Sequence, residues 1–214
     1  MSATDEQEKR QSIIDACRRM NALGINQGTS GNISLRHDAG LLITPTSVSY
    51  EAMQPEQIVY VGLDGAHDPS QQPSSEWRFH RDIYAARPEV RAIVHAHSPF
   101  ATALACLNRG IPAFHYMVAV AGGSDIRCAP YSTFGTQALS DHAVAALAGR
   151  KACLLSHHGM IALGASLAAA LALAVEVETL AGMYCRVLAI GEPALLGEEE
   201  MHAVVDKFAA YNRP

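Results

Sequence analysis

Unbroken apolar runs of membrane-spanning length, a cationic surface and a secretory signal are all missing from this sequence. Charged residues make up 17% of the 214 residues and the formal net charge is -5, so no nucleic-acid partner is expected. The N-terminal stretch MSATDEQEKRQS is charged and lacks the apolar segment of a signal peptide. In the most apolar segment, 166–190, the uncharged run covers only 167–175. We therefore expect a buried helix there and no membrane partner.

Cysteine is sparse and shows no pairing pattern. The cysteines are odd in number, scattered and without CxxC spacing: Cys17, Cys106, Cys128, Cys153 and Cys185. A disulfide framework is not expected, and a reducing, cytoplasmic compartment fits the sequence better. We interpret these cysteines as small core residues rather than as ligands or nucleophiles.

What is present is a core-forming sequence of single-domain length. Hydrophobic residues make up 49% of the chain, and we expect one domain over 1–214. Apolar periodicity predicts helices at 6–23, 73–87, 99–107, 133–147, 166–190 and 198–210, and strands at 33–36, 41–43, 57–61, 90–97 and 151–155. Because the elements alternate loosely and several strands are close in sequence, the predicted fold is α/β. We expect three layers, α/β/α, around a mixed, largely antiparallel sheet.

Two histidines end one of the predicted strands. An apolar run leads into His95-Ala96-His97, and residues two apart in a strand share a face, so both imidazoles are expected to point the same way. Neutral imidazole is a common zinc ligand, and the pair would supply half of a divalent-metal site. The alternative is a strand end whose histidines are only hydrogen-bonded.

A second strand end and a helix start offer the remaining ligands. The strand at 151–155 delivers His157-His158-Gly159, and because adjacent strand residues face opposite ways, only one of these histidines can join the same metal. Glu76 opens a helix, where an acidic residue is most often only complementary to the helix dipole. Three histidines and a carboxylate nevertheless form a sound ligand set for catalytic zinc.

Three loops of small hydrogen-bond donors accompany the candidate ligands. They contain Gly31-Asn32, Thr46-Ser47 and Ser74-Ser75, the last directly before Glu76. Backbone amides and hydroxyls of this kind suit a phosphate without lysine or arginine, and glycine allows close approach. The serines are also good helix N-cap residues, and the first loop is not a Walker loop, because no Gly-Lys-Ser/Thr follows. A metal beside an anion pocket indicates a phosphorylated substrate whose other end reaches the metal.

Together these motifs resemble the class II aldolase and adducin family, and within it the members that act on L-fuculose 1-phosphate. The resemblance extends from about residue 10 to the C-terminus. The stretches that carry it are LGINQGTSGNISLR, LLITPTSVSYE, PSSEWRFHRDIY, RPEVRAIVHAH, LNRGIPAFHYMVAVAGG, CAPYSTFGT and LLSHHGMIALG.

The resemblance implies a role for each motif residue. Zinc would be bound by Glu76, His95, His97 and His158, with His157 left as a structural histidine. Phosphate contacts are implied at Gly31, Asn32, Thr46, Ser47, Ser74 and Ser75. Tyr116 would donate a proton to the aldehyde oxygen from a neighbouring subunit of a homotetramer. Read without the resemblance, Tyr116 is an ordinary core tyrosine.

The implied activity is a lyase reaction. A ketose 1-phosphate such as L-fuculose 1-phosphate would be cleaved reversibly to dihydroxyacetone phosphate and an aldehyde such as L-lactaldehyde. Zinc is a Lewis acid for the charge that develops, and Glu76 is placed to move a proton as general base. No lysine Schiff base is needed, and the only lysines, Lys9, Lys151 and Lys207, lie outside the motifs.

The chain departs from the family pattern at a few positions. Ser47 stands where the fuculose-phosphate enzymes have glycine, and Phe208 and Tyr211 resemble tail residues that close over substrate. These differences bear on the identity of the sugar. The alternatives are an epimerase, dehydratase or decarboxylase on the same scaffold, or a non-catalytic, adducin-like module. A module of that kind should lack the metal ligands.

Overall fold

Seven strands form one mixed sheet in the computed structural model, which describes residues 3–211. They are β1 (Asn32–His37), β2 (Gly40–Ile43), β3 (Val59–Gly62), β4 (Ala92–Ala96), β5 (Arg127–Ala129), β6 (Ala152–Leu155) and β7 (Gly159–Gly164). Their order is β3-β2-β1-β4-β7-β6-β5. Every neighbouring pair is antiparallel except β5 and β6. The predicted mixed, largely antiparallel sheet is therefore confirmed.

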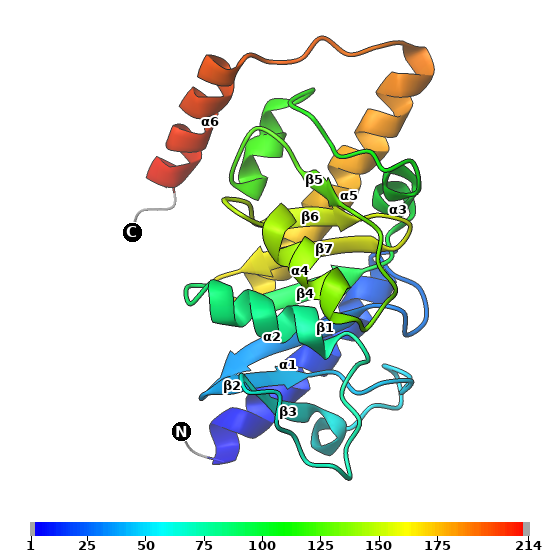
Figure 1. Ribbon diagram of the computed structural model, residues 1–214, viewed down its shortest axis with the longest axis vertical. Coiled ribbons are helices and arrows are strands. Elements are labelled where there is room, and N and C mark those ends of the chain that lie inside the picture. The colour runs from blue at the N-terminus through cyan, green and yellow to red at the C-terminus, as the bar shows by residue number, and fades with distance from the viewer. Residues whose placement is uncertain (1–2, 212–214) are drawn as a thin grey trace.

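Helices cover both faces of this sheet (Figure 1). On one face α2 (Trp77–Ala86) and α4 (Gln137–Ala146) pack together, and on the other lie α1 (Ala3–Ala22), α3 (Pro99–Cys106) and α5 (Leu167–Ile190). The short helices η1 (Pro55–Gln57) and η2 (Tyr116–Ala121) lie in connections, and α6 (Glu198–Tyr211) packs beside η2. One buried cluster lies on each side of the sheet, between the sheet and the helices. Helices, sheet and helices are therefore the three predicted layers.

Strand alternation decides which layer receives the candidate ligands. Along β4, Val94 and Ala96 belong to the core that α5 covers, whereas Ile93 belongs to the core that α2 covers. Since side chains alternate in a strand, His95 shares the α2 face with Ile93. The first turn of α2 thus faces the histidines at the end of β4.

Helix α5 is long and apolar enough to cross a membrane by length and composition. In the structure it packs against β4, β7 and α3, and half of its most apolar window is buried. The Ser166 side chain caps it, since the Ala169 amide donates to Ser166 Oγ at 3.2 Å. The predicted buried helix is confirmed.

Some predictions about local structure are wrong. Strands β5 and β7 are not predicted: β5 has only three residues and depends on parallel pairing with β6, and β7 follows β6 directly after the turn at 156–158. Helix α4 begins at Gln137 rather than 133, since a turn precedes it and Thr136 Oγ1 accepts from the Leu139 amide. Cys106 is exposed rather than a core residue; all the cysteines in the described residues are free.

Candidate metal centre

Four side chains from distant parts of the chain converge on one point. One ligand atom from each of Glu76, His95, His97 and His158 lies within 4.8 Å of all the others. His95 Nε2 is 3.0 Å from Glu76 Oε2 and 3.1 Å from His97 Nε2, and His158 Nε2 is 3.2 Å from Glu76 Oε1. Three imidazole nitrogens and a carboxylate facing one another are a natural cage for a divalent cation.

The backbone around β4 fixes the orientation of its two histidines. His95 Nδ1 lies 2.9 Å from the carbonyl oxygen of Met160 on β7, to which it donates, so the lone pair of His95 is on Nε2 and faces the cluster. His97 follows the last residue of β4, and its amide donates to Asn26 Oδ1 at 3.2 Å. The two rings are on one side, as the His-x-His spacing predicts.

Glu76 is the N-cap of α2, not a residue of its first turn as predicted. The predicted capping by Ser74 and Ser75 is also wrong: Ser74 Oγ accepts only from the Glu76 amide, at 3.3 Å. The Glu76 carboxylate is 4% exposed, and its Oε1 accepts no hydrogen bond within the described residues. A buried carboxylate oxygen without a donor is costly, and a cation held by the four ligands would satisfy it.

Burial and neighbouring groups set the charges of the cluster. Burial opposes the charged form of Glu76, but the adjacent His95 and His158 and an amide donor outweigh it and lower the pKa of the carboxyl to about 2. Burial, with His95 nearby, lowers the pKa of His97 to about 4 and that of His158 to about 3. A carboxylate beside neutral imidazoles is the protonation state that binds a metal.

The two adjacent histidines after β6 point in different directions. His158 points into the cluster, whereas His157 is exposed and its ring contacts Tyr131, with 6.1 Å between the centroids. Both lie in the turn between β6 and β7 and not in a strand, and His157 has a positive φ of 53°. The prediction that only one can join holds, but backbone reversal separates them, not strand alternation.

The three donor loops lie around the cluster. Asn32 pairs with His95 across β1 and β4, and Gly31 approaches so closely that an added Cβ would be 2.5 Å from the His95 carbonyl oxygen. An antiparallel bridge joins Pro45 to Pro73, which brings the loop at 44–47 beside the loop at 72–76. Gly31 and Asn32 are thus beside His95, and the loop that contains Thr46 and Ser47 is beside the loop that leads to Glu76; their role in phosphate binding stays a prediction.

Two of these loop residues have unexpected features. The Asn32 side chain is buried, and its Nδ2 donates to Glu76 Oε2 at 2.9 Å, so its amide group is already engaged by a metal-ligand candidate. Ser47 is exposed with a φ of 57°, a conformation that favours glycine. The backbone at this position would therefore suit glycine better than serine.

Tyr116 and Phe208 lie on η2 and α6 and are not among the four clustered ligands. Tyr116 begins η2, is 49% exposed, and its ring contacts His115. Phe208 is half-buried on α6 against the core that α5 covers. The side chain of Tyr211 lies outside the described residues.

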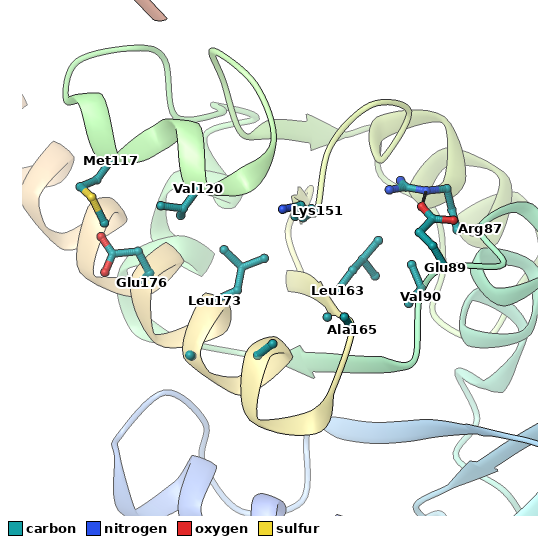
Figure 2. A pocket seen from close by; sticks show the side chains of 13 residues that line it. Arg87, Glu89, Val90, Met117, Val120, Lys151, Leu163, Ala165, Leu173 and Glu176 are labelled. Atoms are coloured by element: carbon teal, nitrogen blue, oxygen red, sulfur yellow. Dashed lines mark hydrogen bonds and ion pairs between the residues drawn. The ribbon is translucent and has the colours of Figure 1, made fainter. Parts of the chain in front are cut away.

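A cavity of about 650 Å³ lies elsewhere, at the opposite end of β4. Figure 2 shows Arg87 and Glu89 on one side of it and Met117 and Glu176 on the other. None of the metal-ligand candidates or donor-loop residues line this cavity. The chemistry is therefore concentrated in the cluster rather than in this hollow.

Known proteins are similar to this chain in both sequence and fold. Residues 11–185 match the family described as Class II Aldolase and Adducin N-terminal domain. The chain is 56% identical over 202 residues to 5-methylthioribulose-1-phosphate/5-deoxyribulose-1-phosphate aldolase of Rhodospirillum rubrum, covering 94% of this chain and 91% of that protein. It is 52% identical over 200 residues to L-fuculose phosphate aldolase of Escherichia coli K12, covering 93% of each. A solved L-fuculose 1-phosphate aldolase matches with a TM-score of 0.92 and 36% identity over 98% of both chains.

Proposed function

The chain belongs to the class II aldolase and adducin family as a lyase, and we propose that it reversibly cleaves a ketose 1-phosphate to dihydroxyacetone phosphate and an aldehyde. The observation that carries the proposal is the convergence of four metal-ligand side chains within 4.8 Å of one another, next to the donor loops. The complete ligand set argues against a non-catalytic, adducin-like module. Zinc is the metal we propose, because three imidazoles and one carboxylate suit it.

Glu76 is the proposed general base. In the direction of synthesis it would take a proton from the hydroxymethyl carbon of dihydroxyacetone phosphate, and that carbon then bonds to the aldehyde. In cleavage the C4 hydroxyl gives its proton to the phenolate proposed for Tyr116, the C3–C4 bond breaks with its electron pair staying on the dihydroxyacetone phosphate fragment, and the protonated Glu76 gives its proton to C3. The pKa of the Glu76 carboxyl is lowered to about 2, so the group is ionised, and substrate would displace it from the metal before it accepts a proton. Bound by the four ligands, a divalent cation would supply Lewis-acid stabilisation of the negative charge that develops.

The loop residues are proposed to hold the phosphate. Ser74 and Ser75 directly precede Glu76, so a phosphate held there would fix the distance between the anion and the base. The bridge between Pro45 and Pro73 places Thr46 and Ser47 beside them. Binding of this kind orients the reacting carbon and contributes to rate through positioning.

Three sugar phosphates are candidates for the substrate. L-fuculose 1-phosphate follows from the sequence motifs and from the relative at 52% identity. The relative at 56% identity favours 5-deoxyribulose 1-phosphate or its 5-methylthio analogue. All three share the phosphorylated end and differ in the aldehyde released, so a panel of the three, each assayed by kcat/KM, identifies the preferred aldehyde.

Tyr116 is proposed to donate the proton to the aldehyde oxygen from a neighbouring subunit of a homotetramer. Its 49% exposure in the single chain leaves the phenol available to a partner. Sizing in solution tests this assembly, and a fully active monomer would contradict it. We also propose that residues 1–214 form a single functional unit and that the protein is cytoplasmic. The one sheet that β1 to β7 share supports the single unit.

Substitution of the ligands tests the reaction. Glu76→Gln and His95→Ala are expected to lower the rate of aldol cleavage at least about 100-fold, and His95→Ala is also expected to lower the metal content. His157→Ala is the matched control, since this exposed neighbour of His158 is outside the cluster and its loss should leave turnover unchanged. Undiminished cleavage by Glu76→Gln would contradict the assignment of the base.

A further inference from the structure

A buried chain of polar side chains leads from the interior of α2 to the metal centre. His80 Nδ1 lies 2.7 Å from Ser34 Oγ, and His80 Nε2 lies 2.5 Å from Asn32 Oδ1. Asn32 Nδ2 in turn donates to Glu76 Oε2 at 2.9 Å. His80 and Ser34 are fully buried and Asn32 is 3% exposed, so bulk water cannot replace these bonds. No motif in the sequence indicated a role for His80.

The hydrogen positions along this chain follow from its chemistry. Asn32 Oδ1 can only accept, so the proton of neutral His80 is on Nε2, and Nδ1 accepts from the Ser34 hydroxyl. Tyr84 closes the chain by donating to the carbonyl oxygen of Ser34 at 3.0 Å. Burial lowers the pKa of His80 to about 3, which keeps the ring neutral. Turning the Asn32 amide over would set its oxygen against the Glu76 carboxylate, two acceptors face to face.

We propose that His80 is a positioning residue: through its Nε2–H it holds the amide of Asn32 with Nδ2 toward Glu76, and thereby fixes the carboxylate at the metal centre. The catalytic part of this inference rests on the proposed function. The ring of His80 also stacks on Phe79, with 4.6 Å between centroids, so a purely packing role is the alternative to be tested. A packing role depends on shape, whereas a positioning role depends on the donor at Nε2.

Two polar substitutions separate these roles. The amide nitrogen of glutamine reaches the place of the imidazole Nε2, so His80→Gln can still donate to Asn32. The shorter amide of His80→Asn reaches only the place of Nδ1 and can meet Ser34 but not Asn32. Both variants remove the ring and its stacking on Phe79, so their difference reports the donor.

Metal affinity is the first readout, measured by competition of the purified protein with a chromophoric chelator for Zn²⁺ and by titration with Co²⁺, whose absorption reports its ligands. His80→Asn is expected to weaken binding about 10- to 100-fold, with an altered Co²⁺ spectrum, whereas His80→Gln stays near the wild type. Equal weakening by the two variants would overturn the proposal in favour of packing. Unfolding curves show that each variant is folded.

A double-mutant cycle tests the route through Asn32. If His80 acts only by holding Asn32, then His80→Asn adds no further loss of metal affinity to Asn32→Ala; additive losses would overturn the proposal. Should His80→Asn fail to fold, Ser34→Ala serves instead, because it removes the hydroxyl that keeps the proton on Nε2. It is expected to weaken metal binding in the same direction, and unchanged binding would overturn the inference.

Catalysis is the second readout. His80→Asn is expected to lower kcat for aldol cleavage with a smaller effect on KM, because Asn32 is the one predicted phosphate residue that His80 contacts, and His80→Gln should restore most of the kcat. A rise in KM alone would contradict the positioning role. If the wild type cleaves none of the sugar phosphates, the proposed function fails, while the metal measurements still decide the role of His80.

Discussion

Replacement of Ser47 by glycine tests whether the backbone conformation at this position favours glycine. Ser47 has a φ of 57°, and the left-handed region costs a residue with a side chain about 1–2 kcal/mol. Glycine avoids that cost but gives the unfolded chain more freedom, which removes about 0.5–1 kcal/mol of stability. Ser47→Gly is therefore expected to raise the free energy of unfolding slightly, by about 0.5–1 kcal/mol.

Ser49 supplies the matched control. It is also exposed, lies two residues away, and is not among the residues with positive φ. Ser49→Gly gains nothing in the folded state and is expected to lose about 0.5–1 kcal/mol. The difference between the two variants cancels the unfolded-chain contribution and should equal the left-handed cost, about 1–2 kcal/mol.

Urea unfolding of both variants at the same metal concentration measures this difference. Thermal unfolding gives a second estimate, since 1 kcal/mol shifts the Tm of a protein of this size by about 2–4 °C. Equal destabilisation by the two glycines would refute the conformational explanation. The KM of Ser47→Gly for the sugar phosphate should stay the same or fall, because the backbone amide remains; a clear rise would show that the hydroxyl binds phosphate.

Two further predictions concern the histidines. In Gly159→Ala, the new Cβ would lie 2.5 Å from the Ala96 carbonyl oxygen and 3.0 Å from His97 Cδ2, so the end of β4 must move. We expect a loss of about 1–3 kcal/mol in urea unfolding and weaker metal binding, and unchanged values would contradict the contact. In the metal-free protein, the pKa values of His80 and His158 are both lowered from 6.5 to about 3. From pH 6.5 down to about 3 the unfolded chain binds protons that the folded protein does not. The free energy of unfolding therefore falls as pH is lowered, by up to about 1.4 kcal/mol per unit for each ring. Stability that stays flat between pH 7 and pH 5 in chelator would refute this.

The sequence alone was sufficient for the layered fold and for the chemistry of the ligands. A period of two places His95 and His97 on one face, and helical periodicity marks 166–190 as a core helix; both predictions agree with the structure. These patterns can be detected in the sequence because they depend on residues only two to four positions apart. Strands β5 and β7 are not predicted; the three residues of β5 carry no period of their own and need β6 beside them.

Other features required the tertiary structure. The choice between His157 and His158 depends on a backbone reversal after β6, and the position of Glu76 depends on where α2 begins over the sheet. The bonds from His80 to Asn32 and from Asn32 to Glu76 join residues 48 and 44 positions apart. No local pattern encodes such pairs, because they exist only once β1 lies beside β4 and α2 packs across both. The sequence by itself determined which side chains are candidates for binding a metal and a phosphate. The packing of strands and helices decided which of them meet, and that the buried His80 bonds to Asn32 beside them.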